Sequence, residues 1–224
     1  MSKFIKEWLP LIVIIILVIL SRIFIWDSVT VDGPSMDPTL ANGQRLIMAK
    51  VGGFQRFDVV VAKETLQQTQ KNDSSATSPK TIVKRVIGMP GDTLTWNNDK
   101  LTIVDSSGKM VVQNDSESYL SNYQALFKSG QLANTYLTGS SMSNLSTADR
   151  QSFADMASAA KAFTVDSTGN PNFTVKVPAG EYFLVGDDRI VSADSRMVGS
   201  FTKSQIQGKV LFRFWPLTKI GGIN

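Results

Sequence analysis

The chain has 224 residues, a formal net charge of +4, and neither cysteine nor histidine. Its length suits one domain of ordinary size, with room for an insertion. The missing residues exclude disulfides, thiol nucleophiles, the Ser-His-Asp triad and metal sites built on cysteine or histidine, and the scattered lysines and arginines predict no nucleic-acid partner.

The N-terminal segment is predicted to be a membrane anchor. Residues 8–20, WLPLIVIIILVIL, carry no charge, and SRIFIW extends the apolar run to Trp26. A helix over 8–26 would measure roughly 28 Å, close to a bilayer core, with a tryptophan near each interface. A cleaved signal peptide is the alternative, but the bulky residues after the apolar run do not resemble a cleavage site.

The charges before the anchor predict its orientation. Lys3 and Lys6 precede the apolar run and favour a cytoplasmic N-terminus. We therefore expect residues 1–26 to form a cytoplasmic tip and anchor, and 27–224 an extracytoplasmic domain of a single-pass plasma-membrane protein. The lack of cysteine suits that compartment.

Short β segments dominate the rest of the chain. They are rich in branched residues and lie at 45–50, 56–63, 81–88, 92–96, 100–104, 173–177, 181–186 and 209–215. Residues 97–99, NND, predict a hairpin loop. Such closely spaced strands indicate a mainly β fold, an antiparallel barrel-like or sandwich-like domain.

Two stretches differ from this pattern. Residues 65–80 are polar and predict a mobile loop. Residues 105–171 are rich in Ser, Asn and Ala and contain two helix-like stretches, 118–130 and 146–163, in the second of which apolar residues recur at helical spacing. We interpret this region as a partly helical insertion between strands.

Ser35 lies between Pro34 and Pro38 in VDGPSMDPTL, a few residues beyond the anchor. Prolines restrict the backbone around them, which fits either a stiff linker or the seat of a nucleophile. Without histidine or cysteine, a reactive serine needs a carboxylate, a lysine or a tyrosine as its base. An exposed lysine stays protonated because its pKa is about 10.4, but burial lowers that pKa.

Lys84 lies in the apolar β run TIVKRVIG, residues 81–88. Alternation places it on one strand face with Ile82 and Val86, so its amine is expected to be desolvated. The alternative is an edge-strand lysine that opposes aggregation. A third polar stretch, GDDRIVSADSRMVG at 186–199, indicates either a solvated turn or a shell of ion pairs and hydroxyls around a reactive lysine.

Four segments in this order resemble the characteristic boxes of type I signal peptidases: PSMDPTL at 34–40, RFDVVVA at 56–62, KRVIGMPGD at 84–92 and GDDRIVSADSR at 186–196. Members of that family are membrane-bound serine proteases with a Ser-Lys dyad, and the single anchor resembles their Gram-positive form. The resemblance implies a hydrolase that removes signal peptides from secretory preproteins, contacts membrane lipid and requires no cofactor.

The resemblance also implies roles for the reacting residues. Ser35 matches the nucleophile, which forms an acyl-enzyme, and Lys84 matches the general base. Some members carry an assisting serine where this chain has Gly33. We therefore expect backbone N–H groups, chiefly that of Ser35, to form the oxyanion hole.

The last box supplies the supporting residues that the family implies. Ser192 matches the serine that hydrogen-bonds the lysine amine, and Asp194, Arg196 and Arg85 match residues that brace the site. Asp188 stands where the family has asparagine.

The substrate is expected to be an extended chain flanked by residues 56–62 and the segment that carries Lys84. Two alternatives remain open at this point. One is a related Ser-Lys processing peptidase dedicated to one substrate, and the other is an inactive, membrane-tethered β-domain that binds peptides.

Overall fold

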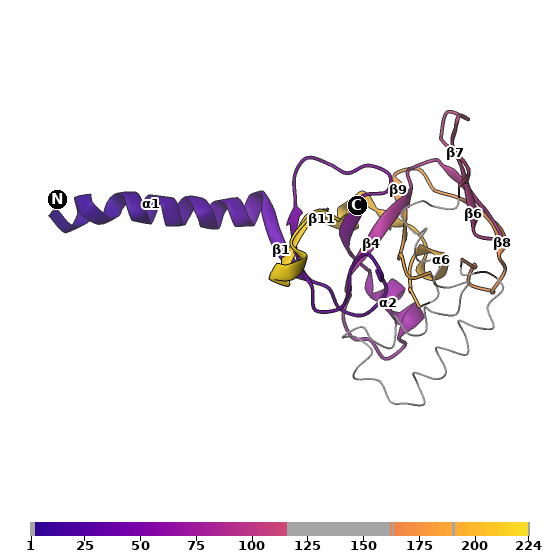
Figure 1. The fold of residues 1–224 in the computed structure, drawn as a ribbon, viewed down its shortest axis with the longest axis horizontal. Helices are drawn as coiled ribbons and strands as arrows, with labels where there is room; N and C mark the ends of the chain where they lie inside the picture. The colour runs from indigo at the N-terminus through magenta and orange to yellow at the C-terminus, as the bar shows by residue number, and fades with distance from the viewer. Residues whose placement is uncertain (1–2, 116–161, 163, 190, 224) are drawn as a thin grey trace.

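The structure, a computed structural model, describes residues 3–115, 162, 164–189 and 191–223. A long helix, α1 (Lys3–Phe24), projects from a mainly β body (Figure 1). Its stretch Glu7–Phe24 is long and apolar enough to cross a membrane and is not buried by the body. The helix ends at Phe24, and Trp26, expected to end the anchor, instead begins the first strand.

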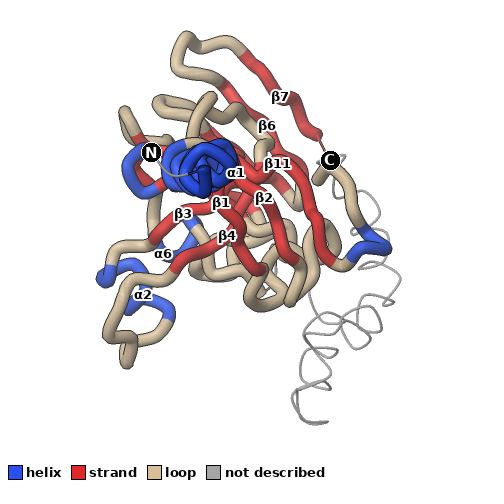
Figure 2. The backbone as a smooth tube through the Cα atoms, turned by 90° about the vertical axis from the view of Figure 1, so that its left-hand side faces the viewer, coloured by secondary structure: helices blue, strands red, loops and turns tan. Residues whose placement is uncertain are grey.

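The larger of two sheets has seven strands in the order β1-β2-β11-β3-β4-β9-β10. Their bounds are β1 (Trp26–Thr30), β2 (Arg45–Ala49), β11 (Ile206–Trp215), β3 (Val59–Lys63), β4 (Thr81–Gly88), β9 (Glu181–Val185) and β10 (Phe201–Thr202). Every pair is antiparallel, which confirms the predicted fold class. Figure 2 looks along α1 and shows the strands of the body grouped behind it.

The position of β3 corrects one expectation about the substrate. This strand pairs with β11 on one side and with β4 on the other, so the backbone of the segment RFDVVVA has no free edge at β3. Of the two segments expected to flank the substrate, the first part of β4 is the one that lacks a second partner among the described strands. Strand β4 pairs with β3 from Thr81 onwards but with β9 only from Arg85.

The smaller sheet has the order β7-β6-β5-β8. It comprises β7 (Met110–Asp115), β6 (Lys100–Val104), β5 (Thr93–Asn97) and β8 (Asn172–Lys176). The predicted hairpin between β5 and β6 is present, and Asn98 and Asp99 make its turn with positive φ angles of 47° and 66°, as a tight hairpin requires. Strand β7 occupies part of the region read as an insertion, while both expected helical stretches lie outside the described residues except for Ala162.

The polar stretch 65–80 was expected to be a loop, and this is wrong for its first half, which forms helix α2 (Leu66–Asn72). Thr65 Oγ1 accepts a hydrogen bond from Gln68 N, and the Gln68 side chain accepts one from Thr65 N. This reciprocal cap satisfies two N–H groups that a helix start leaves free. The underside of α2 is held by polar contacts, since Gln68 Nε2 donates to Ser200 O.

Short helical turns complete the body: α6 (Ser195–Val198), η2 (Lys203–Gln205) and η3 (Leu217–Lys219). One apolar cluster includes Met36 and Val83, which are 1% and 8% exposed. These are the neighbours of Ser35 and Lys84 in the chain. Burial of the two apolar side chains therefore fixes the backbone on which both polar side chains are carried.

Candidate active site

Ser35 lies in the loop that connects β1 to β2. Backbone hydrogen bonds run from Asp37 N to Pro34 O and from Leu40 N to Met36 O, at 2.8 and 2.9 Å. Met36 and Leu40 point into the core and are almost fully buried. The tight turn and its two apolar anchors hold Ser35 at the wall of a pocket.

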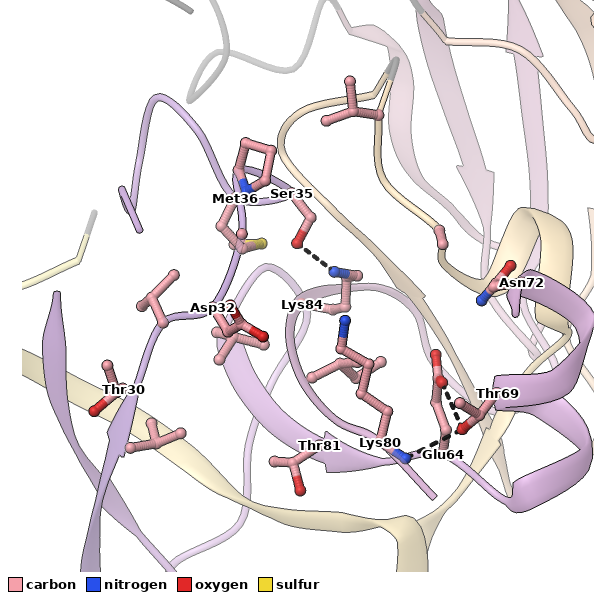
Figure 3. A pocket seen from close by; sticks show the side chains of 18 of the residues that line it. Thr30, Asp32, Ser35, Met36, Glu64, Thr69, Asn72, Lys80, Thr81 and Lys84 are labelled. Atoms are coloured by element: carbon pink, nitrogen blue, oxygen red, sulfur yellow. Dashed lines mark hydrogen bonds between the residues drawn. The ribbon is translucent and has the colours of Figure 1, made fainter. Parts of the chain in front are cut away.

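Lys84 projects from β4 and donates a hydrogen bond from Nζ to Ser35 Oγ over 2.6 Å (Figure 3). The residue is only 3% exposed, which confirms the expected desolvation. Burial lowers the pKa of Lys84 to about 8, against the opposing influence of the Asp194 and Glu64 carboxylates. A neutral amine is thus accessible near neutral pH, as a base requires.

The pocket beside Ser35 has a volume of about 320 Å³. Residues 29–36 line one side and residues 80–84 the other, and Glu64, Thr69, Asn72 and Asp73 line its far end. Among the described strands, the segment of β4 from Thr81 to Lys84 has a partner on one edge only. The pocket therefore combines a hydroxyl, a buried amine and a free strand edge.

Arg85, the next residue in β4, forms a buried ion pair with Asp187. Its Nε and Nη2 donate to the two carboxylate oxygens of Asp187 at 2.9 and 2.7 Å. Thr39 Oγ1, from the Ser35 loop, donates to the same carboxylate at 2.5 Å. Asp187 thereby links β4, which carries Lys84, to the loop that carries Ser35.

A second ion pair lies after β9. Arg196 donates from Nε and Nη2 to the carboxylate of Asp194 at 2.9 and 2.8 Å, and Gly186 N donates to it at 3.0 Å. Burial alone would raise the pKa of the Asp194 carboxyl, but the Arg196 guanidinium and these hydrogen bonds hold it below its usual value. Gly186 in turn lies so close to Ser35 O and Ser192 Oγ that a Cβ there would stand 2.4 and 2.1 Å from them.

Comparisons with known proteins identify the family of the chain. The family model described as "Signal peptidase, peptidase S26" matches residues 5–215. The chain belongs to this signal peptidase family. The match includes all four boxes, so the family inferred from the motifs is confirmed.

Similar proteins carry the same description. The chain is 47% identical over 220 residues to a signal peptidase I of Streptococcus pneumoniae strain R6, covering 98% of this chain and 97% of that protein. It is 36% identical over 226 residues to signal peptidase IB of Staphylococcus aureus strain COL, covering 98% and 94%. A solved signal peptidase I from Enterococcus faecalis matches with a TM-score of 0.40 and 21% identity over 71% of this chain and 97% of that chain.

In this signal peptidase, Ser192 lacks the hydrogen bond to the Lys84 amine that was expected of it. It is 4% exposed and close enough to Asp194 to help lower the pKa of that carboxyl. Its Oγ nevertheless has no partner with good hydrogen-bond geometry among the described residues. The orienting bond from Ser192 to the Lys84 amine therefore stays a prediction.

Asp188, which is expected to stand at a position where the family has asparagine, lies beside the Ser35 loop. It is fully buried, and its N–H donates to Ser35 O at 3.2 Å. Its carboxylate accepts a longer bond from Val191 N at 3.3 Å. The residue helps to fix the Ser35 backbone.

Two residues at the signal peptidase site were not anticipated, namely Asp187 as the partner of Arg85 and Thr39 as a third member of that cluster. Both lie inside the boxes that carry the resemblance, yet their pairing depends on contacts between residues 148 positions apart. Within the described part of the chain, no three His, Cys, Asp or Glu side chains gather as a metal site would require.

Proposed function

We propose that this signal peptidase family member is a membrane-bound serine endopeptidase that removes signal peptides from exported preproteins, with Ser35 as nucleophile and Lys84 as general base. The observation that carries the proposal is the 2.6 Å hydrogen bond between a buried lysine amine and the serine hydroxyl. The printed descriptions of the relatives, signal peptidase I and IB, support the substrate class.

The reaction begins with Lys84 in its neutral form. The amine accepts the hydroxyl proton while Ser35 Oγ attacks the scissile carbonyl carbon. Lys84 then returns that proton to the leaving amine, which departs as the new N-terminus of the mature protein. Lys84 then takes a proton from a water molecule, which attacks the ester that links Ser35 to the signal peptide, and returns that proton to Ser35 Oγ as the signal peptide leaves with a free carboxylate.

The tetrahedral intermediate needs hydrogen-bond donors for its oxyanion. The N–H of Ser35 donates to no acceptor within the described part of the chain, which supports its role as one donor. Gly33 has no side chain to assist, and its N–H donates to Asn42 Oδ1 at 2.9 Å. The oxyanion hole of this protein is therefore built from backbone.

The substrate is an extended chain that enters the pocket between two segments of the body. Thr81 to Lys84 offer a strand edge with one side unpaired among the described strands, and residues 29–34 line the opposite wall. Backbone pairing with β4 positions the scissile bond over Ser35 and places few demands on side chains.

Helix α1 serves as the anchor. Its apolar stretch confines the body to the membrane surface, where signal peptides remain embedded. Lys3 and Lys6 favour a cytoplasmic N-terminus, which puts the body from residue 27 onwards on the other side of the membrane. The resulting localisation is the plasma membrane, in a single pass, with preproteins and lipid as partners.

Cleavage of labelled preproteins by the detergent-solubilised protein tests the proposal. Ser35→Ala and Lys84→Ala should each abolish cleavage, because they remove the nucleophile and the base. Lys84→Arg should abolish it too, since a guanidinium does not give up its proton near neutral pH. Ser28→Ala and Lys63→Ala, at exposed positions outside the pocket, serve as matched controls and should retain activity. Circular dichroism verifies folding of each variant.

Two outcomes of this experiment would count against the proposal. Substantial turnover by a folded Ser35 or Lys84 variant would remove that residue from the reaction. Cleavage of one preprotein among several unrelated ones would replace a general signal peptidase with a dedicated processing peptidase.

A further inference from the structure

The membrane helix meets the catalytic body through an unusually short junction. Helix α1 ends at Phe24 and β1 begins at Trp26, so that only Ile25 lies between them. Ile25 N donates to Ser21 O and Ile25 O accepts from Lys50 N, both at 2.8 Å. The connecting residue is thus bonded on one side to the helix and on the other to Lys50, the residue after β2.

Lys50, which directly follows β2, extends its side chain onto the end of the helix. Its Nζ donates to Arg22 O at 3.1 Å and to Ile23 O at 3.2 Å. The last carbonyls of a helix lack partners within it, and a cation there is favoured by the helix dipole. One ammonium therefore satisfies two carbonyls of α1 from a position in the body.

The same ammonium also holds the start of β1. Lys50 Nζ lies 3.0 Å from a carboxylate oxygen of Asp27, and the pKa of Asp27 is lowered chiefly by its hydrogen bond with Lys50. Trp26 Nε1 adds a bond to Ser21 Oγ at 3.2 Å. The helix end, the first strand and the second strand are thus joined around one side chain.

We propose that Lys50 is a positioning residue, which sets the angle between the membrane helix and the body and so holds Ser35 at the height of a membrane-embedded substrate. The inference rests on the proposed function, because it requires α1 in the bilayer and a preprotein as substrate.

Strand β1 converts a small change of angle at the junction into a large displacement of the Ser35 loop. Strand β1 runs from the junction directly into the loop that carries Ser35. Its five residues span about 17 Å, so a tilt of about 20° at the junction would move the far end by roughly 6 Å. A displacement of that size exceeds the tolerance of a reacting pair. A soluble peptide follows the moved site freely, whereas a substrate held in the bilayer does not.

In the first test, the full chain is reconstituted in phospholipid vesicles and its activity is measured on two substrates. One is a membrane-embedded preprotein, and the other is a soluble peptide that spans the cleavage site of that preprotein. Lys50→Met should lower kcat/KM for the embedded preprotein about 5- to 20-fold and for the peptide less than about twofold. Lys50→Arg, which retains a cation with several donors, should restore most of the loss. Lys209→Met is the matched control, because it breaks a 2.8 Å ion pair with Asp58 on the same sheet without touching α1.

The second test measures the angle itself and needs no activity. The chain contains no cysteine, so Ser107→Cys in the exposed turn between β6 and β7 provides a single labelling site for a donor fluorophore. Energy transfer to acceptor lipids at the bilayer surface reports the height of this turn. Lys50→Met should broaden the distribution of distances, and Lys209→Met should leave it unchanged.

The outcomes separate the two ideas. An unchanged distance distribution in Lys50→Met, equal losses on both substrates, or undiminished cleavage of the embedded preprotein would overturn the role of Lys50. If the unmodified protein cleaves neither substrate, the proposed function fails, and the energy-transfer measurement still decides whether Lys50 fixes the helix.

Discussion

Arg85 and Asp187 are held together by two parallel hydrogen bonds of 2.9 and 2.7 Å, although 102 positions separate them in the chain. Both residues are buried, and Thr39 completes the group from the Ser35 loop. The strand that carries Lys84, the loop that carries Ser35 and the loop after β9 therefore meet at the Asp187 carboxylate.

Removal of that carboxylate should damage both stability and activity. Asp187→Ala removes the carboxylate that pairs with the buried Arg85 guanidinium, whose Nη1 still donates to Phe57 O at 2.8 Å, and breaking a buried ion pair in this way typically costs about 3–5 kcal/mol of folding free energy. Urea denaturation of the detergent-solubilised protein measures this loss. Lys209→Met, which breaks a partly exposed pair, should cost no more than about 1 kcal/mol, and an equally small loss in Asp187→Ala would show that the pair does not hold the site.

The rate should depend on the protonation of Lys84. Its pKa is about 8 because the amine is buried, and only the neutral amine accepts the Ser35 proton. We expect kcat/KM to rise with pH, with a midpoint near 8, and to level off above it. A pH–rate profile with a midpoint near 10.5, the ordinary lysine value, would contradict the role of burial.

The same shift also has a consequence for stability. Between about pH 8 and 10.5 the unfolded chain binds a proton at this lysine that the folded chain does not. The free energy of unfolding should therefore gain a contribution that rises with pH in this window. Unfolding of Lys84→Met, compared with the unmodified chain at both ends of the window, isolates the contribution.

The charges of Lys80 and Glu64, which both line the pocket, should move this midpoint in opposite directions. Figure 3 shows the Lys80 side chain extending through the pocket towards Lys84, with Glu64 beside Thr69. Glu64 raises the pKa of Lys84 and Lys80 lowers it, alongside the larger influence of Asp194. Lys80→Met should move the midpoint up and Glu64→Gln should move it down, each by a few tenths to one unit. Shifts of the same sign in both variants would refute this explanation.

Gly186 should tolerate no side chain. A Cβ at this position would stand 2.1 Å from Ser192 Oγ and 2.4 Å from Ser35 O, distances that force the Ser35 backbone to move. Gly186→Ala should lower kcat by at least about 100-fold, because a shift of about 1 Å is enough for such a loss. Gly221→Ala, where a Cβ meets no atom within 4 Å, should behave like the unmodified protein.

Ser192 is predicted to orient the Lys84 amine without forming a covalent bond itself. Ser192→Ala should lower kcat about 10- to 1000-fold, equivalent to roughly 1.4–4 kcal/mol of barrier, with a much smaller change in KM. An acylating inhibitor should still label Ser35 in this variant, more slowly. Normal turnover would exclude Ser192 from the site, and inhibitor attached to Ser192 would overturn the assignment of the nucleophile.

Local patterns were enough to predict most of the strands. The run TIVKRVIG coincides with β4 (Thr81–Gly88), since branched residues buried on both faces leave little choice of structure. Helix α2 was missed because its polar residues carry no apolar periodicity. Its strongest local signal is the capping pair of Thr65 and Gln68, three residues apart, which form the reciprocal cap.

The site, too, could be predicted from local sequence only in part. The burial of Lys84 followed from its neighbours Ile82 and Val86, which are buried beside it. The pairing of Arg85 with Asp187 could not be predicted, because no local pattern specifies which of several nearby carboxylates a guanidinium will meet after folding. That choice depends on how the loop after β9 packs against β4.

The half-paired edge of β4 also bears on self-association. An unpaired strand edge is a template for another copy of the chain as well as for a substrate. Among the described strands, the open run of β4 comprises the four residues from Thr81 to Lys84, and Pro79 just before it has no N–H to extend the ladder. A docked strand gains few backbone bonds, which favours quick release of a cleaved peptide and disfavours the stacking of strands that leads to aggregates.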